Sequence, residues 1–224
     1  MSLQQNLITV HKNIQRSIPT YSDLFDADTE VLVGEGVGMD GPKVGDIAPD
    51  FELPDALGRN VRSQDLRANG PLVINFYRGN WCPYCNLELR TLQLHLPQIT
   101  TLGASLVAIS PQIPDQSLTT AEKNELAFPV LSDVGNVVAR RFGLVFALAE
   151  HLRPIYTELG IDLPKFNGTN TFELPVPGTF IIDRNAVIQA VHVDVDYKKR
   201  MEPAHILEVL TDLRSHHAAQ ARIP

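Results

Sequence analysis

The stretch PLVINFYRGNWCPYC, residues 71–85, joins a compact apolar run to two cysteines three residues apart. The run PLVINFY has the length and composition of a buried central strand. After the cysteines, apolar residues recur at the spacing of an amphipathic helix: Leu89, Leu92, Leu96 and Ile99. The cysteines are therefore predicted to lie at a strand-to-helix turn, at the N-terminus of the helix.

This position favours reactive thiols. Free amide donors and the positive end of the helix dipole stabilise a thiolate, and cysteines in such settings have pKa values of about 3.5 to 7.5, against about 8.5 for a free thiol. The spacing also brings the second sulfur near the first, so an oxidised sulfur on one cysteine can be resolved by the other. Cys82 and Cys85, which are the two cysteines of the chain, are predicted to be catalytic.

Other interpretations of the cysteine pair fit the sequence less well. A zinc site needs further ligands, but there is no third cysteine, and the seven histidines show no matching spacing. Two inert, buried cysteines would not require the adjacent strand-to-helix turn. We therefore expect no metal, and we also expect no cofactor.

Composition and sequence pattern limit which classes of partner and which cellular compartment are expected. The chain has 224 residues, of which 44% are hydrophobic and 20% charged, and its net charge of −7 argues against binding to nucleic acid. No apolar run approaches the roughly 18 to 20 residues of a membrane helix. The N-terminal stretch has no pattern of a signal peptide, so a cytoplasmic protein is expected. In a reducing compartment, a CxxC pair is redox-active or metal-binding more often than structural.

The first 43 residues are predicted to form a helical extension followed by a linker. Leu3, Leu7, Val10 and Ile14 lie on one side of a first helix. Five glycines then fall between residues 34 and 45. They include a GxGxxG pattern, but a proline follows it directly where a nucleotide-binding loop needs a helix, so a linker is the better interpretation.

Strand and helix signals alternate from residue 44 onward, which predicts an α/β fold. Further strands are expected at 104–110, 179–183 and 186–195, and further helices at 117–126, 134–142 and from Pro203. Residues 144–175 interrupt this alternation and are predicted to be an insertion. The domain is expected to span residues 44–217, with a C-terminal tail at 218–224.

The stretch PVPGTFIID, residues 175–183, carries a second signal. The X-Pro bond is the one peptide bond for which the cis form is inexpensive. A proline directly before a buried strand can also simply begin that strand, and both interpretations stay open on the residues alone.

WCPYC after an apolar strand, together with PGTFIID, resembles the thioredoxin fold, a central mixed β-sheet flanked by helices. In that fold a cis-proline loop faces the CxxC pair and offers backbone pairing to substrates. The resemblance implies that Pro177 is this cis-proline, that Val176 precedes it, and that both bind substrate together with Thr179.

A narrower resemblance is to the peroxiredoxins, the alkyl hydroperoxide reductase and thiol-specific antioxidant family, in a branch that carries CxxC. It rests on VGDIAPDFEL (44–53), NFY (75–77), LVAIS (106–110) and ELPVPGTFIID (173–183). It covers about residues 44 to 213. It implies a thiol peroxidase that acts on hydroperoxides and is re-reduced by thioredoxin or a similar thiol donor. Peroxiredoxin relatives are often dimers, which suggests a homodimer.

The peroxiredoxin motif Phe-Tyr-Pro-x-x-x-Thr-x-x-Cys can be laid on residues 76–85. Cys85 then falls on the peroxidatic cysteine, and Cys82 falls on the threonine that helps to hold the peroxide. Arg78 replaces the shielding proline, and we hypothesise that it supplies hydrogen-bond donors to the peroxide. Trp81 is expected to pack beside the site. Pro177 stands where the family has an arginine.

Three functions are compatible with these features. In a thiol peroxidase, Cys85 attacks the hydroperoxide and Cys82 resolves the sulfenic acid. In a thioredoxin-like dithiol oxidoreductase acting on protein disulfides, Cys82 attacks and Cys85 resolves. In a redox-regulated binding module, oxidation of the pair would change a partner surface in the 144–175 insertion. The expected cis-proline favours the dithiol oxidoreductase, whereas the domain framework favours the peroxidase.

Overall fold

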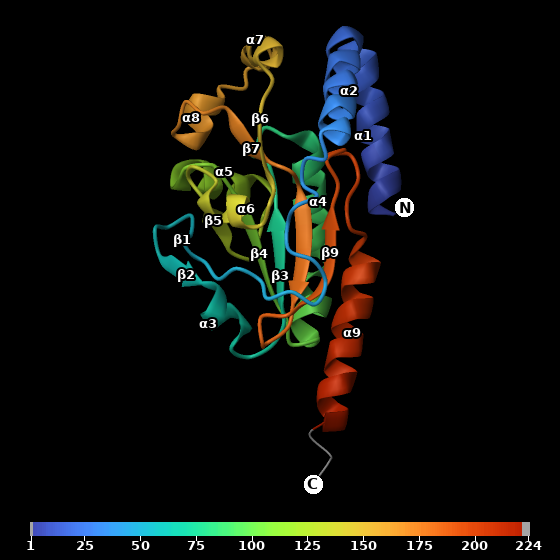
Figure 1. Cartoon of the computed structure of the whole chain (residues 1–224), viewed down its shortest axis with the longest axis vertical. Helices are drawn as coiled ribbons and strands as arrows, with labels where there is room; N and C mark the ends of the chain where they lie inside the picture. The colour runs from blue at the N-terminus through green and yellow to red at the C-terminus, as the bar shows by residue number, and fades with distance from the viewer. Residues whose placement is uncertain (1, 221–224) are drawn as a thin grey trace.

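A central mixed sheet organises the molecule, whose computed structural model describes residues 2–220 (Figure 1). Its strand order is β5-β4-β3-β8-β9. β3 pairs in parallel with β4, as does β4 with β5, whereas β8 is antiparallel to both β3 and β9. The strands are β3 (Leu72–Phe76), β4 (Ser105–Ser110), β5 (Val130–Ser132), β8 (Gly178–Ile182) and β9 (Ile188–Val193). The predicted fold class is confirmed.

The central strand β3 is buried on both faces. It can be buried because each of its side chains is either apolar or hydrogen-bonded. Ile74 and Phe76 belong to the apolar cluster on one face, and Val73 belongs to the cluster on the other, as the two-residue period of a strand requires. The second cluster contains side chains from α4 (Pro83–Thr101) and α9 (Pro203–Gln220). β3 therefore delivers the chain from the middle of the core to the start of α4.

Shorter elements cover the opposite face and the lower edge of the sheet in Figure 1. They are the hairpin of β1 (Glu52–Pro54) and β2 (Asn60–Arg62), and the helices α3 (Ser63–Arg67) and α6 (Val137–Arg141). The helix α5 (Pro114–Lys123) lies beside α4, where its Ala121 packs against the cluster on the α4 face. In the part of the chain that the structure describes, no helix is long and apolar enough to cross a membrane.

The N-terminal extension forms two helices, α1 (Leu3–Ser17) and α2 (Pro19–Gly34). The predicted apolar stripe on α1 is confirmed, because Leu3 and Leu7 are buried in the core cluster beside α4 and α9. The N-terminus of α1 is held by the carboxylate of Glu202, which accepts hydrogen bonds from the backbone N–H groups of Leu3 (3.1 Å) and Gln4 (2.8 Å). The extension is thus packed on the domain.

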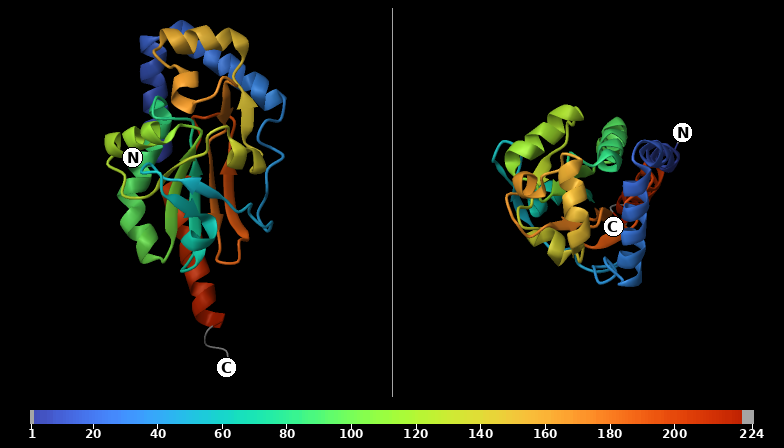
Figure 2. Two further views of the ribbon diagram at one scale, coloured as in Figure 1. Left: turned by 90° about the vertical axis from the view of Figure 1, so that its left-hand side faces the viewer. Right: turned by 90° about the horizontal axis from the view of Figure 1, so that it is seen from above.

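Residues 144–175 form a small unit of their own at the upper end of the sheet. β6 (Val145–Ala147) and β7 (Glu173–Pro175) pair at its two ends, and between them lie η1 (Glu150–Leu152), α7 (Arg153–Glu158) and α8 (Leu163–Asn167). Figure 2 shows α7 beside α2, and the rings of Phe25 and Tyr156 meet there edge to face at 5.8 Å. The insertion and the N-terminal extension therefore cover the same end of the domain.

The domain boundaries themselves stay predictions. Residues 35–46 form turns and irregular chain between α2 and the hairpin, where the linker was expected. The predicted tail 218–224 begins within α9, which continues to Gln220, and its last four residues, 221–224, lie outside the described residues.

Candidate active site

Cys82 and Cys85 lie at the predicted turn between β3 and α4. Cys82 is the N-cap residue of α4, and its sulfur accepts a hydrogen bond from the backbone N–H of Cys85 over 3.4 Å. Both are free thiols with no exposed surface. The sulfur of Cys82 thus occupies the place of a capping oxygen, where helix N–H groups favour negative charge.

Arg78 joins Cys82 to the aromatic wall of the site. Its Nη2 atom donates to Cys82 Sγ over 3.4 Å. Its guanidinium lies 3.9 Å from the centre of the Tyr197 ring and 5.2 Å from that of Trp81. Burial would lower the pKa of Arg78, but the charge of Cys82 raises it, so the guanidinium keeps its proton.

Arg200 supplies a second cation, which the sequence patterns did not reveal. Its Nη2 atom lies 3.7 Å from Cys85 Sγ, and its Nη1 atom pairs with Glu88 Oε2 at 2.5 Å. Both partners of this ion pair are buried. Pro177 stands where the family motif has an arginine, and Arg200 brings a guanidinium to Cys85 from the segment after β9. The run Lys198-Lys199-Arg200 was the available signal, but nothing in the local sequence marks the arginine as the residue that reaches the thiols.

The two thiols have pKa values shifted in opposite directions. Burial tends to raise the pKa of Cys82, but the hydrogen bond from Cys85 and the charges of Arg78 and Arg200 outweigh it and hold this pKa well below its usual value. Burial raises the pKa of Cys85 well above its usual value, and the neighbouring Cys82 thiolate adds to the shift. Of the two thiols, Cys82 is therefore the one that loses its proton first.

Glu88 stands behind Cys85 on the next turn of α4. Burial raises its pKa to about 7, although the charge of Arg200 partly offsets this. The carboxyl group therefore changes its protonation near neutral pH, at a site in contact with the guanidinium that faces Cys85.

Trp81 packs over the chain just before the cysteines, as expected. A Cβ atom at Gly79 would overlap the Trp81 indole, so glycine permits this close approach. The indole also meets Tyr156 of the insertion edge to face, with the ring centres 5.5 Å apart. The indole N–H of Trp81 and the Nε–H of Arg78 are buried without a hydrogen-bond partner.

The prediction that Pro177 is a cis-proline is wrong. No peptide bond between residues 2 and 220 is cis. The chain before Pro177 continues the extended path of β7, because the N–H of Val176 donates to the carbonyl of Leu144 (2.6 Å). This N–H is therefore already paired.

The other residues expected to bind substrate lie at different distances from the thiols. Pro177 lines a small cavity together with Arg78. Val176 is buried in the core cluster below the sheet. The hydroxyl of Thr179 accepts a hydrogen bond from Asn75 in the interior of the sheet, over 3.1 Å. Arg78 and Trp81 are the members of the predicted set that stand around Cys82.

Comparison with known proteins identifies the family. The model of the AhpC/TSA family matches residues 44–191, about two thirds of the chain. The chain belongs to the AhpC/TSA family. This confirms the resemblance to peroxiredoxins, and it makes this AhpC/TSA protein an oxidoreductase of the peroxiredoxin type, with a cysteine pair in place for a dithiol cycle.

Individual relatives of this AhpC/TSA protein are also peroxiredoxins. It is 34% identical to a putative peroxiredoxin of Mycobacterium tuberculosis over 113 residues, which are 50% of this chain and 73% of the relative. It is 34% identical to peroxiredoxin Bcp of Escherichia coli over 106 residues, 47% of this chain and 67% of the relative. Among solved structures, peroxidoxin BcpB of M. tuberculosis superposes with a TM-score of 0.60 at 27% identity, covering 77% of this chain and 97% of that one. The thioredoxin-like fold is thereby confirmed.

The family match leaves out two parts of the AhpC/TSA protein that reach the site. The helices α1 and α2 precede residue 44, and Tyr197 and Arg200 follow residue 191. The contacts of Arg78 with Tyr197, and of Cys85 with Arg200, therefore depend on residues beyond the matched region.

Proposed function

We propose that the protein reduces hydroperoxides with Cys82 as the attacking sulfur and Cys85 as the resolving one. The observation that carries this proposal is the pair of hydrogen bonds to Cys82 Sγ, one from Arg78 and one from the Cys85 amide. Only a thiolate attacks at a useful rate, and these donors stabilise the thiolate at Cys82. The order is the reverse of the one that the peroxiredoxin motif predicts from the sequence.

The proposed cycle has three steps that balance. The Cys82 thiolate attacks the distal oxygen of ROOH, the O–O bond breaks, and RO⁻ takes a proton and leaves as ROH, so that Cys82 becomes a sulfenic acid. Cys85 then gives up its proton and its thiolate attacks this sulfur; the S–O bond breaks, a disulfide forms, and the leaving hydroxide takes up the proton and departs as water. A dithiol donor of the thioredoxin type finally reduces the disulfide by thiol-disulfide exchange and is itself oxidised.

The two arginines take separate parts in this cycle. Arg78 faces the attacking sulfur, so its guanidinium is placed to stabilise the charge that develops on the oxygens as the O–O bond breaks. Arg200 faces the resolving sulfur, and its pairing with Glu88 holds it there. Arg78 is thus assigned to the peroxide step and Arg200 to the resolution step.

A thioredoxin-like reductase of protein disulfides is the second candidate, and it shares Cys82 as its nucleophile. Two observations weigh against it. Neither sulfur has exposed surface, whereas a protein disulfide must approach the attacking sulfur in line. The N–H of Val176, which such a reductase would offer to its substrate, is occupied by Leu144. A small peroxide requires no backbone pairing, and it needs a smaller opening than a protein disulfide does to reach the buried sulfur.

The test uses Cys82→Ser and Cys85→Ser proteins treated with a limiting amount of hydroperoxide. Mass spectrometry locates the sulfenic acid, and insulin reduction is measured in parallel. We expect sulfenic acid at Cys82 in the Cys85→Ser protein, no peroxide consumption by Cys82→Ser, and no reduction of insulin. Sulfenic acid confined to Cys85 would reverse the assigned order. Rapid insulin reduction that depends on Cys82, with negligible peroxide turnover, would establish the second candidate instead.

Three further predictions accompany the proposed peroxidase. The electron donor is a thioredoxin-like protein, the chain forms a homodimer, and the protein is cytoplasmic. Coupled assays with thioredoxin and its reductase test the first, and the molar mass in solution tests the second. Inactivity in both the peroxide and insulin assays, together with a partner that binds only the oxidised chain through residues 144–175, would favour the redox-regulated binding module.

A further inference from the structure

A partly open cavity is lined by Arg78, Trp81 and Pro83, close in sequence to the attacking Cys82. It lies where α2 and α7 meet, and Figure 2 shows these two helices at one end of the molecule. Its volume is about 180 Å³. The N-terminal helices form one wall with Ile14, Ile18, Ser22 and Phe25. Arg78 and Trp81 lie in the opposite wall, so the same guanidinium that contacts Cys82 also faces this space.

The cavity has the properties of a site for an apolar group. Its walls are mostly aliphatic and aromatic side chains, contributed by the two N-terminal helices, the insertion and the start of α4. Apolar cavities of about 150 Å³ in proteins take up benzene. A space of about 180 Å³ is therefore large enough for one aromatic ring or a branched alkyl group of similar size.

Two residues that line the cavity each carry a buried donor without an acceptor. The Nε–H of Arg78 and the Nε1–H of Trp81 are buried and unpartnered. A buried donor left without a partner costs about 1–3 kcal/mol, which a ligand oxygen would recover. The ligand that fits best is apolar over most of its length and carries oxygen atoms at the end nearest Cys82.

We infer that α1 and α2 complete a substrate pocket that receives the organic group of a bulky hydroperoxide, with the peroxide oxygens at Arg78 and Trp81. The inference rests on the proposed peroxidase function and adds the part of the chain that sets its selectivity. Hydrogen peroxide has no group to fill the cavity, so an aryl hydroperoxide gains binding energy that hydrogen peroxide lacks. Because Cys82 Sγ is fully buried, the oxygens reach it after a shift of a side chain in the cavity wall.

The N-terminal wall is held in place by contacts on both helices. His11 Nδ1 of α1 lies 3.1 Å from the hydroxyl of Tyr84, on the first turn of α4. Asp26 of α2 pairs with Lys198 at 2.8 Å, next to Tyr197. Each helix is thus tied to a segment that also carries an active-site residue. Because the two helices are fixed in place, the wall that they form can discriminate between substrates by size. Helices that moved freely could not.

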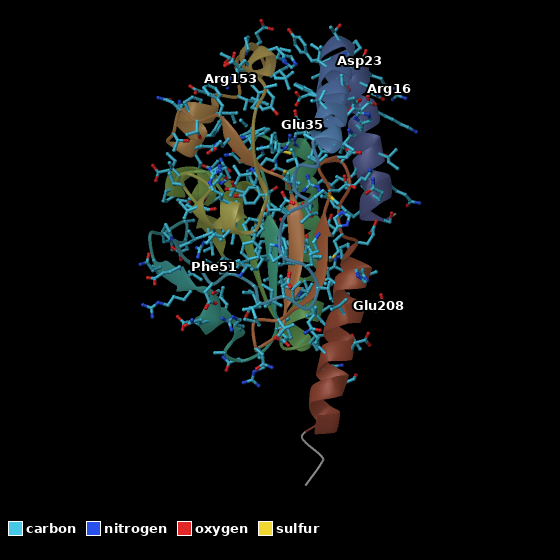
Figure 3. The ribbon with its side chains drawn as sticks, in the orientation of Figure 1. Arg16, Asp23, Glu35, Phe51, Arg153 and Glu208 are labelled. Atoms are coloured by element: carbon cyan, nitrogen blue, oxygen red, sulfur yellow. The ribbon has the colours of Figure 1, made fainter. Side chains whose placement is uncertain are left out.

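The test compares two hydroperoxides in variants that fill the cavity. Ser22→Leu adds a larger side chain at a buried position of the wall, and Ile18→Phe does so from the turn between the helices. Asp23→Leu is the matched control, because Asp23 is the exposed neighbour of Ser22 on the same helix (Figure 3). The measured quantity is the ratio of kcat/KM for cumene hydroperoxide to kcat/KM for hydrogen peroxide.

We expect the ratio to fall at least about tenfold in each filling variant, since a methylene-sized misfit in an apolar pocket changes selectivity by about 10–200-fold. Asp23→Leu should keep the wild-type ratio. An unchanged ratio in both filling variants, with turnover of either peroxide intact, would overturn this inference and leave the proposed peroxidase standing. Absence of peroxide turnover in the wild type would overturn the proposed function.

A binding measurement separates the pocket from the chemistry. Trp81 is the only tryptophan of the chain and lines the cavity, so its fluorescence reports on an occupant. Titration with 2-phenyl-2-propanol, the alcohol formed from cumene hydroperoxide, should give a saturable change in emission that Ser22→Leu weakens and Asp23→Leu does not. A non-saturable response in the wild type would show that the cavity does not take up the aryl group.

Discussion

Arg78 donates a hydrogen bond from its Nη2 atom to the sulfur of Cys82 over 3.4 Å. The arginine lies two residues after the end of β3, and the cysteine caps α4, so the turn between the two elements brings cation and sulfur together. The face of the guanidinium rests on Tyr197, which prevents it from turning away. A sulfur without exposed surface thereby has a permanent positive charge beside it.

Removing this charge should raise the pKa of Cys82. In a Cys85→Ser background, Arg78→Ala should shift the pH profile of Cys82 alkylation by iodoacetamide upward, because the thiolate loses its main cationic neighbour. The alkylation rate of the parent protein falls as the pH decreases through the pKa of Cys82, and the rate of the variant should fall from a higher pH. Arg78→Lys should restore part of the shift. Arg59→Ala, an exposed arginine, is the control, and superimposable profiles for Arg78→Ala and its parent would contradict the role of Arg78.

Glu88 should make stability depend on pH. Its pKa is about 7 in the folded protein, against 4.5 for an ordinary glutamate, so the native state binds more protons than the unfolded state between these values. Glu88 therefore makes its full contribution to the free energy of unfolding below about pH 4.5. This contribution is lost as the pH rises through about 7. The loss should be about 3 kcal/mol, from roughly 1.4 kcal/mol for each pKa unit.

Urea unfolding of wild type and Glu88→Gln at a series of pH values measures this contribution. The difference between the two proteins should change across the window from pH 4.5 to 7, because glutamine does not titrate. A difference that stays constant over the window would mean that Glu88 keeps an ordinary pKa despite its burial.

The packing of α1 on the domain predicts different effects for two adjacent residues. Leu7 has no exposed surface, whereas Ile8 is 46% exposed. Leu7→Ala should cost about 2–5 kcal/mol of the free energy of unfolding through the cavity it leaves, and Ile8→Ala less than about 0.5 kcal/mol. Denaturant titration gives both values. Equal, small losses at the two positions would show that α1 is not part of the cooperative unit.

The carboxylate of Glu202 should act as a cap on α1. Glu202→Ala removes the acceptor for the N–H groups of Leu3 and Gln4, and should cost about 0.5–2 kcal/mol. Glu208→Ala, an exposed glutamate farther along α9 (Figure 3), should cost less than about 0.5 kcal/mol. Thermal unfolding of the two variants side by side tests the cap, and a Glu208 loss as large as that at Glu202 would refute it.

Several features of the fold followed from local patterns alone. The apolar run at 71–77 predicted β3, and the stripe from Leu89 to Ile99 predicted α4. Together they placed the cysteines at a helix N-terminus. Such patterns are reliable because the faces of a strand and a helix repeat every two and about 3.6 residues, and a segment cannot bury its apolar face without showing that period.

Other features required the folded chain. Arg200 stands 115 residues from Cys85 in sequence, and no local pattern marks it as buried. The peptide bond before Pro177 is trans, and the N–H of Val176 pairs with Leu144, which lies at the other end of the insertion. Sequence motifs indicated which position of a known family each residue matches. They could not indicate which distant segment of the chain packs beside that residue.

The sequence by itself determined that two thiols meet at the start of a helix in a thioredoxin-like domain. The tertiary structure decided which thiol carries the charge, because Arg78 and the helix N–H groups converge on Cys82, while Glu88 shares the cation near Cys85. It also decided that α1 and α2 form a wall beside the thiols. Charge stabilisation and cavity shape depend on distances between segments remote in sequence, and only packing sets those distances.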